Sequence, residues 1–461
     1  MTRRHFLAAS AAPLVAQPRR PNIIFLLGDD HRWDALGCMG NPIIRTPNLD
    51  ELGRNGVIFQ KNFVTTAICV SSRASLFTGL YSRCHKIWEF RNEFPADTLS
   101  RTYPMLLRDA GYRTGFIGKW GIDGGKPPSA HFDYWRGFQG QGRYFPDPQN
   151  PKLHLTTVMG NQAIEFLNNS GPDRPFCLSV SFKAPHVQDE DPRQFLADPQ
   201  DDELYRNVEI PVPKTAAPEY IRALPLSVQR SEARRRWAVR FATPELFQQS
   251  VKNYYRLISG IDRVTGRIRE QLRRMGAEDN TVIIYTGDNG FYLAEHGLAG
   301  KWFMHEESIR TPLIIHDPRQ QQSRRGRRIE AMTLNIDCAP TMLDLAGLRP
   351  PPSMQGRSML PLANGARTEW REEFFYEHHF SSNGWLPSTE GVRTTDWKYT
   401  LYTDEPQTTE ELFDLKADPL EERNLAASAA PQMLTRLRER RQAWIRQLDQ
   451  WTPDKSWQDP A

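Results

Sequence analysis

The chain has 461 residues, of which 39% are hydrophobic and 25% charged, and its formal net charge is +4. These proportions are those of an ordinary folded protein, so an intrinsically disordered chain is excluded. The length predicts two domains, or one large and one small. So mild a charge is not typical of nucleic-acid-binding proteins, and we expect no nucleic-acid partner. The basic clusters at residues 234–236 and 324–328 are interpreted as solvated surface loops.

The first 17 residues are predicted to be a targeting segment rather than part of the fold. Arg3 and Arg4 precede a short, alanine-rich and weakly apolar run, a pattern typical of a twin-arginine export signal. Residues 1–17 therefore predict a signal peptide and a periplasmic or secreted protein. No other stretch approaches the roughly 18 apolar residues that span a bilayer, so we expect no membrane span.

Five short apolar runs, taken in chain order, predict strands that are buried on both faces of a parallel sheet. They are residues 22–27, 114–117, 176–180, 281–285 and 313–315. Helical patterns lie between them, and the strongest covers residues 251–275 and is closed by Gly276. Residues 188–243, rich in Pro, Arg and Asp, are interpreted as a long irregular insertion near the active face. The alternation of strands and helices predicts an α/β fold with a large, mostly parallel sheet between helices.

The sequence changes character after Gly347. Residues 350–352 are three prolines and predict a linker, and strand-like pieces follow at 373–376 and 397–402. A last helix is predicted over residues 431–451, with one apolar face that we expect to pack on a core. Residues 348–461 are therefore predicted to form a smaller C-terminal α+β subdomain.

The five cysteines are scattered without the paired spacing of a zinc site, and their odd number leaves at least one unpaired. If Cys69 has a special role, the other four are expected to be buried thiols or to form up to two disulfides. They are Cys38, Cys84, Cys177 and Cys338.

Polar residues follow the ends of the predicted strands. Ligands of open parallel sheets bind at the carboxyl ends of the strands, so these side chains are expected to converge on one rim. Any one of them alone could be a helix cap or a turn former. The set is Asp29, Asp30, Lys119, His186, Asp288, Asn289 and Lys301.

The expected rim sorts by chemistry into two groups and a proton donor. Three aspartates and Asn289 supply the hard oxygen ligands that Ca²⁺ or Mg²⁺ prefers. Arg73, Lys119 and Lys301 add three positive charges, which suit a sulfate or phosphate ester. His186 is the group best suited to protonate a leaving oxygen. Cys69 leads the segment CVSSR that supplies Arg73, although its apolar neighbours also fit a buried core thiol.

These motifs resemble those of the type I sulfatases, within the alkaline-phosphatase-like superfamily. Residues 69–73 lie where that family carries Cys-x-Pro/Ala-x-Arg, and residues 74–81 match its usual continuation. The resemblance runs through nearly all of the chain after residue 21. Its further motifs are residues 111–115, 118–120, 184–186, 286–290, Lys301, 411–415 and 418–425. The resemblance implies a sulfatase catalytic domain over residues 20–347.

The resemblance also implies a cofactor made from the chain itself. A maturation enzyme, as a partner, would oxidise Cys69 to Cα-formylglycine, whose hydrate offers one hydroxyl to attack sulfur and another to expel sulfate. Asp29, Asp30, Asp288, Asn289 and the formylglycine at position 69 would hold one Ca²⁺. Arg73 would support the hydrate, Lys119 and Lys301 would bind sulfate oxygens, and His186 would donate the proton.

Two positions depart from the family pattern. Ser71 replaces the usual Pro or Ala of the cysteine motif, and Gly121 replaces the histidine that normally follows Lys-Trp. That histidine normally helps to regenerate the aldehyde, and the candidates to replace it are His85, His131 and His305.

Substrate is suggested by two segments, residues 132–144 and 301–308, which are similar to segments of sulfatases acting on glycosaminoglycan sugars. Their aromatic residues could stack on sugar rings or pack in the core. A sulfated carbohydrate is the first choice and an aryl sulfate the second. The alternatives are a phosphodiesterase or phosphonate hydrolase of the same superfamily, and a non-catalytic binder of sulfated glycans.

Overall fold

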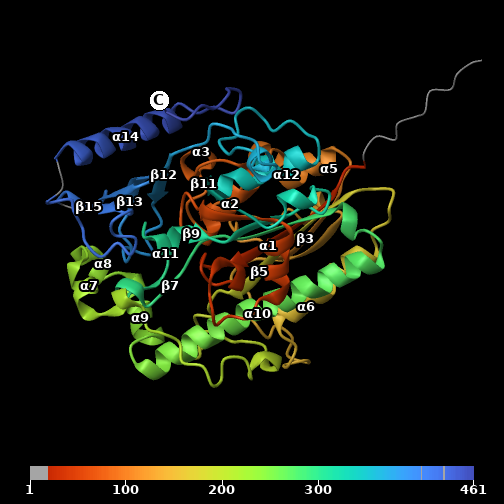
Figure 1. Cartoon of the computed structure of the whole chain (residues 1–461), viewed down its shortest axis with the longest axis horizontal. Coiled ribbons are helices and arrows are strands. Elements are labelled where there is room, and N and C mark those ends of the chain that lie inside the picture. The colour runs from red at the N-terminus through yellow and green to blue at the C-terminus, as the bar shows by residue number, and fades with distance from the viewer. Residues whose placement is uncertain (1–18, 406, 429–430, 461) are drawn as a thin grey trace, which may run out of the picture.

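The computed structural model describes residues 19–405, 407–428 and 431–460. The predicted signal peptide, residues 1–17, lies outside the described residues. Figure 1 shows a central sheet between two layers of helices, with a second, smaller sheet and a long helix at one side.

The central sheet has nine strands in the order β11-β2-β10-β6-β1-β5-β3-β4, with β9 paired to β2. Strands β6, β1, β5, β3 and β4 are mutually parallel, whereas β10 runs antiparallel to both of its neighbours. All five predicted strands are present, and the α/β fold class is confirmed. The strands are β1 (Asn22–Asp29), β2 (Val57–Phe63), β3 (Arg113–Lys119), β4 (Tyr134–Phe138), β5 (Phe176–Pro185), β6 (Thr281–Gly287), β9 (Arg310–Thr311), β10 (Leu313–His316) and β11 (Arg327–Leu334).

Helices cover both faces of this sheet because its strands are apolar on both sides. On one face lie α1 (Pro47–Asn55), α6 (Leu155–Asn168) and α10 (Pro244–Arg274). On the other lie α2 (Cys69–Thr78), α5 (Tyr103–Asp109) and α12 (Cys338–Leu345). The predicted helix over 251–275 is α10, which begins earlier, at Pro244, because the Thr243 side chain caps the amide of Leu246 at 3.2 Å.

The irregular insertion predicted over residues 188–243 is present only in its first half. Residues 188–217 contain loops, bends and two 3₁₀ turns, whereas the rest contains three short helices, α7 (Pro218–Ala223), α8 (Leu226–Gln229) and α9 (Glu232–Arg240). Pro218 is at the first position of α7, where its missing amide proton costs nothing, so proline content was misleading here. The interpretation of the basic clusters as loops was wrong for residues 234–236, which lie on α9, and is confirmed in part for residues 324–328, where a 3₁₀ turn and a turn precede Arg327 and Arg328 at the start of β11.

The C-terminal part is an antiparallel sheet with one helix, as predicted. Its strands are β12 (Glu373–His378), β13 (Thr389–Thr394), β14 (Trp397–Tyr402) and β15 (Thr409–Asp414), paired in chain order. Helix α14 (Pro431–Asp449) covers this sheet and buries Leu437, Trp444 and Leu448. The same apolar cluster contains Phe63 and Tyr81, so it joins this sheet to the central one. The boundary at residues 347–348 stays a prediction.

The remaining elements are short. They are α3 (Ser82–His85), α4 (Ala96–Ser100), β7 (Tyr292–Leu293), β8 (Ala299–Gly300), α11 (Glu306–Ile309), α13 (Leu360–Ala363), and the 3₁₀ turns η1 (Gly37–Met39), η2 (Ser129–His131), η3 (Pro199–Asp201), η4 (Lys214–Ala216), η5 (Glu278–Asn280), η6 (Glu295–Gly297), η7 (Gln322–Arg324) and η8 (Asn335–Asp337).

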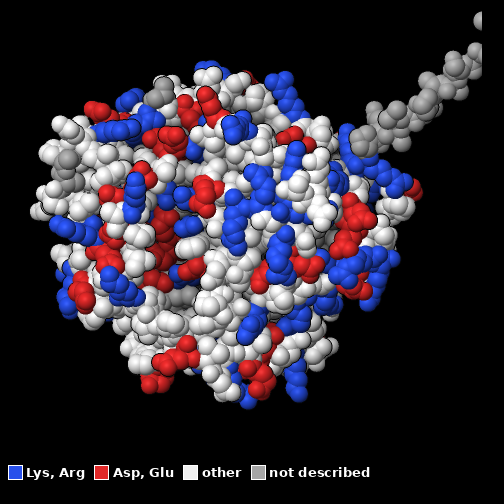
Figure 2. Space-filling view, in the orientation of Figure 1, with Lys and Arg blue, Asp and Glu red and all other residues white. Residues whose placement is uncertain are grey.

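All five cysteines are free thiols, so the disulfide alternative was wrong and the thiol alternative is confirmed. Only Cys38 is partly exposed, and the others are buried. No helix of the described residues is both long and apolar enough to cross a membrane. On the face shown in Figure 2, basic and acidic side chains are interspersed.

Candidate active site

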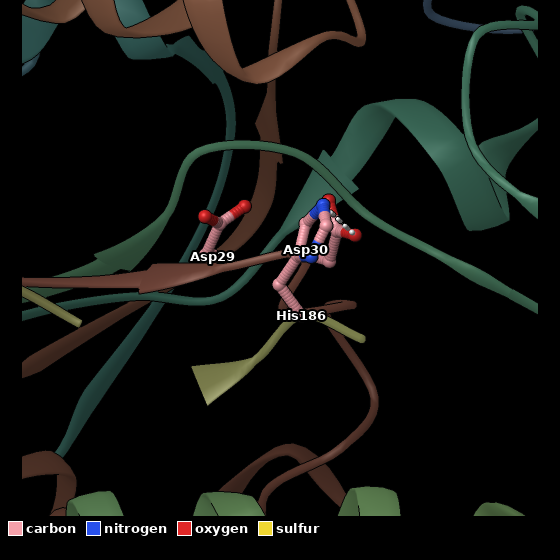
Figure 3. A group of neighbouring side chains, drawn as sticks. All are labelled: Asp29, Asp30 and His186. Atoms are coloured by element: carbon pink, nitrogen blue, oxygen red, sulfur yellow. Dashed lines mark ion pairs between the residues drawn. The ribbon is translucent and has the colours of Figure 1, made fainter. Parts of the chain in front are cut away.

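The carboxyl ends of neighbouring strands β6, β1 and β5 bring the predicted site together. Asp29 is the last residue of β1, Asp288 follows β6, and His186 follows β5. Asp30 turns the chain with a φ of 64°, in the left-handed region where aspartate is better tolerated than most residues. Figure 3 shows His186 reaching toward the carboxylate of Asp30, with Asp29 alongside. These side chains are at most 4% exposed.

Three oxygen atoms of this cluster lack a hydrogen-bond partner. They are Oδ1 of Asp29, Oδ2 of Asp30 and Oδ1 of Asn289, and all three are buried. Leaving a buried polar atom unsatisfied costs about 1–3 kcal/mol, and more when it is charged. Three orphaned oxygens at one rim are the donor set that a hard divalent cation needs, so these residues fit Ca²⁺ or Mg²⁺.

Asp288 has a different environment from the other predicted cation ligands. Its Oδ1 accepts the backbone amide of Asp30 at 3.0 Å, and its Oδ2 accepts Nε of Arg73 at 2.8 Å. Conversely, His186 lies nearer to the cation donors than expected, since its Nε2 is 3.6 Å from Oδ2 of Asp30. Asp29, Asp30 and His186 each present a ligand atom within 4.8 Å of the others.

The three positively charged side chains predicted for the site form ion pairs with the three carboxylates. Lys119 Nζ is 2.5 Å from Asp29 Oδ2, and Lys301 Nζ is 2.5 Å from Asp30 Oδ1. Arg73, fully buried, pairs with Asp288 at 2.8 Å and lies 3.3 Å from Asp29.

Counting side chains, three positive charges face three negative ones in this cluster. A bound divalent cation would make the cluster +2, which an oxyanion would offset.

Burial and neighbouring charges shift the pKa values of the groups in this cluster in different directions. Burial alone raises the pKa of Asp29, but nearby cations led by Lys119 outweigh it and hold the pKa well below its usual range. Burial, with the charge of Asp29, raises the pKa of Asp288 to about 7. Burial and the charge of Lys301 hold the pKa of His186 well below its usual value.

Cys69 is the first residue of α2, a helix buried along its whole length, and it is 1% exposed. Burial raises the pKa of its thiol, against the opposing charges of Lys119 and Lys301. A thiol with a raised pKa is a poor nucleophile, so this environment disfavours a plain cysteine mechanism. The charges of both lysines that are predicted to bind sulfate therefore act on position 69.

Gly121 has a φ of +80°, which favours glycine, and it lies directly against Arg73. A Cβ at this position would come within 2.6 Å of Cδ of Arg73. The histidine of the usual family motif therefore does not fit here unless Arg73 moves.

None of the three candidate replacement histidines contacts the cluster of buried charges. His85 uses both ring nitrogens elsewhere, on Ser75 Oγ and the amide of Ile87, each at 3.0 Å. His305 Nδ1 is hydrogen-bonded to the hydroxyl of Tyr292 at 2.7 Å, and its ring stacks on another histidine. His131 is exposed.

Three further residues reach the cluster without having been given a role from the sequence. Ser181 accepts Nη1 of Arg73, and Gln141 accepts Nζ of Lys119 at 2.6 Å. Lys183 is 1% exposed, and burial together with the charge of Lys119 lowers its pKa to about 8. Ser181 and Lys183 are alternate residues of buried strand β5, and polar residues at that spacing in an apolar run were a usable signal.

The aromatic residues of the two suggested substrate segments mostly pack in the core. Phe132 and Trp135 belong to an aromatic cluster around Phe116, and Phe303 is 1% exposed. Tyr144 is fully buried, and its hydroxyl donates to the carbonyl of His186 at 2.6 Å. The packing interpretation therefore accounts for these side chains.

A parallel sheet whose rim gathers three carboxylates, three cationic side chains and a buried cysteine is the kind of site that suits a hydrolase of oxyanion esters. The family described as Sulfatase matches residues 21–348, and the family described as N-sulphoglucosamine sulphohydrolase, C-terminal, matches residues 294–447. The chain belongs to the sulfatase family, within the type I, alkaline-phosphatase-like group, and is a sulfuric ester hydrolase.

Individual relatives agree with this assignment. An N-acetylglucosamine-6-O-sulfatase of Bacteroides thetaiotaomicron is 30% identical over 92% of this chain and 86% of its own length. A solved structure described as a complex with its substrate D-glucosamine-2-N,6-O-disulfate is 28% identical, with a TM-score of 0.79 over 95% of this chain and all of that one. A phosphonate monoester hydrolase of Agrobacterium radiobacter shares the fold, at 23% identity and a TM-score of 0.71 over 92% and 96% of the two chains.

We expect Asp30→Asn to weaken Ca²⁺ binding by more than about 100-fold, because even outer partners of metal ligands cost 10–100-fold. The measurement is the rise in unfolding temperature when Ca²⁺ is added to chelator-treated protein. Asp34→Asn is the control, since Asp34 is paired with Arg32 at 2.5 Å outside the cluster. Equal Ca²⁺ stabilisation in both variants would refute the cation site.

We expect Gly121→Ala to lower the free energy of unfolding by about 1–3 kcal/mol more than Gly111→Ala does. Gly111 has a comparable φ of +94° but nothing within 4 Å of its Cβ position, so it isolates the backbone strain from the overlap with Arg73. Chemical denaturation measures both. Equal losses would show that a Cβ at position 121 is accommodated beside Arg73 and would contradict the overlap.

Proposed function

We propose that the protein hydrolyses a sulfate ester of a glycosaminoglycan-type carbohydrate, using formylglycine made from Cys69 and one bound Ca²⁺. The observation that carries this proposal is the set of three orphaned buried oxygens on Asp29, Asp30 and Asn289, beside the ion pairs of the two aspartates with Lys119 and Lys301. The choice of a sugar follows the relatives, two of which are named for sulfated glucosamine derivatives.

Asp29, Asp30 and Asn289 would hold the cation, with Asp288 fixing both Asp30 and Arg73. Formylglycine, once formed, supplies a nucleophilic hydroxyl, and Ca²⁺, when bound, supplies a Lewis acid. With Asp29 and Asp30 holding the cation, Lys119 and Lys301 would lose their present partners. Lys119 and Lys301 would then be available to the sulfate oxygens, whose negative charge they stabilise.

His186 is proposed to protonate the departing alcohol. Its Nδ1 lies 2.7 Å from the carbonyl oxygen of Val187, which can only accept, so Nδ1 carries a proton and Nε2 faces the cluster. The ring is therefore oriented by the backbone and presents Nε2 to the reaction. Because Nδ1 holds the single proton of the neutral ring, Nε2 can donate only from the imidazolium form, which the negative charge of a bound sulfate ester favours.

The oxyanion-binding geometry alone does not discriminate sulfur from phosphorus. The test is a panel of matched esters, in which each sulfated sugar is compared with its phosphate, phosphodiester and phosphonate counterparts. Faster hydrolysis of the phosphorus esters would overturn the proposal in favour of the phosphonate hydrolase alternative. Salt-dependent binding without any hydrolysis would favour the glycan binder.

We expect His186→Ala to lower kcat for the hydrolysis of sulfated sugars by about 10²- to 10⁴-fold, because their leaving groups are poor. An activated aryl sulfate needs no proton at its leaving oxygen and should lose much less. The exposed His131→Ala is the control. Equal losses on both substrate types would contradict the role of His186 as general acid.

We expect formylglycine at position 69 when the protein is made in a host that has the maturation enzyme. Mass spectrometry of the tryptic peptide of residues 62–73 measures it, with protein from a host lacking that enzyme as control. An unmodified thiol in protein from the native source would show that CVSSR is not a maturation site.

Recovery of the mature chain from the periplasm, without residues 1–17, would test the proposed export.

A further inference from the structure

A group of charges on α9 and the chain after β5 lies beside the active site and is not used by the proposed chemistry. We call Asp189, Arg236 and Arg240 the Asp189 cluster. Arg240 Nη2 donates to Asp189 Oδ1 at 2.6 Å, and Arg236 Nη1 lies 3.4 Å from the same oxygen.

Two independent paths connect this cluster to residues of the active site. Asp189 follows closely after His186 in the chain. The guanidinium of Arg236 lies over the ring of Trp302, 5.1 Å from its centroid, and Trp302 directly follows Lys301. Helix α9 also packs against β8, which leads into Lys301. The Asp189 cluster is therefore tied to both the proposed proton donor and a proposed sulfate ligand.

The ring of Trp302, over which Arg236 lies, is held in a fixed position. Trp302 has a φ of 90°, in the left-handed region, and is 4% exposed. The hydroxyl of Tyr376, from the C-terminal sheet, donates to its carbonyl oxygen at 2.6 Å. A stacked guanidinium on a fixed ring keeps its charge at a defined position.

The Asp189 cluster has more positive charge than its own partners neutralise. Arg240 is 1% exposed, yet its Nη1 has no hydrogen-bond partner. Arg236 is held by Glu232 at 2.9 Å, but Glu232 is also paired with Arg235. Burial and the charge of Arg236 lower the pKa of Arg240 to about 10, as expected for a cation short of anionic partners.

We propose that Arg236 and Arg240 bind a second anionic substituent, a sulfate or a carboxylate, of the sugar whose sulfate ester is hydrolysed. This inference rests on the proposed function, since it names the substrate as a saccharide carrying at least two acidic groups. An acidic oxygen satisfies the unpartnered Nη1 of Arg240 and offsets the excess charge. The substituent lies on the side of His186 and Lys301, where the sugar departs.

Binding is measured first, by calorimetry on Cys69→Ala protein loaded with Ca²⁺, which cannot turn over. The ligands are one sugar with a single sulfate, the same sugar with a second sulfate, and the same sugar with a carboxylate instead. We expect the doubly acidic ligands to bind about 10- to 100-fold tighter, the range of one charge-assisted hydrogen bond. The better of the two identifies the anionic substituent. Equal affinity for all three ligands would overturn the proposal.

The role of Arg236 in binding is tested with Arg236→Gln. This residue is chosen because it is partly exposed and its replacement leaves the buried Arg240 in place. We expect Arg236→Gln to remove most of the preference for the doubly acidic ligand. Arg235→Gln, on the same helix but stacked on Trp385, is the matched control and should keep the preference. A similar loss in both variants would point to a general surface charge effect and overturn the assignment.

Kinetics with the matured enzyme separate this inference from the proposed function. The ratio of kcat/KM for the doubly and singly acidic sugars should fall about 10- to 100-fold in Arg236→Gln. If the unaltered enzyme hydrolyses aryl sulfates but no sulfated sugar, the proposed function fails, while the calorimetric preference still decides on the Asp189 cluster. If sulfated sugars are hydrolysed without any preference, only the cluster assignment fails.

Discussion

The rest of this structure depends on the mutual neutralisation of six buried charges at the rim of the central sheet. Asp29, Asp30 and Asp288 are almost completely excluded from solvent, and so are Arg73, Lys119 and Lys301. Removing an ion from water costs several kcal/mol, so each charge needs a partner at short distance and further hydrogen bonds. The short contacts among these side chains meet that need, and the three oxygens left over are the ones that a cation would occupy. This arrangement supports the proposal that the site binds a metal and an oxyanion together.

The topology of the central sheet and the C-terminal sheet both position these groups. Parallel strands β6, β1, β5 and β3 are consecutive neighbours, so their carboxyl ends deliver carboxylates, the histidine and Lys119 to one edge. Lys301 comes from a different source, the chain after the small β7–β8 hairpin. That chain continues through Trp302, which the C-terminal sheet holds through Tyr376. The second sheet therefore fixes a wall of the active site as well as covering apolar surface.

The departure at Gly121 is consistent with the packing around it. Because Arg73 fills the space that a side chain at position 121 would need, glycine and the arginine position are coupled. Loss of the usual histidine is then part of a local arrangement in which Arg73 contacts the carbonyl of Lys119 at 2.6 Å. The three histidines that were candidates to replace it are engaged or exposed elsewhere, so none of them is placed at the cluster of buried charges.

The sequence by itself determined the fold class, the five apolar strands, the long helix α10 and the residues that gather at the rim. It could do so because apolar runs and the polar residues that end them are local patterns. Strands β2 and β11 escaped notice because polar residues such as Lys61 and Glu330 interrupt them, and β10 gave no sign of its antiparallel direction. Only the tertiary structure decided which cation meets which carboxylate, that Asp288 binds Arg73, and that the basic cluster of α9 lies beside Trp302. Those pairings join residues far apart in the chain, and no local periodicity encodes which distant side chain will be the neighbour.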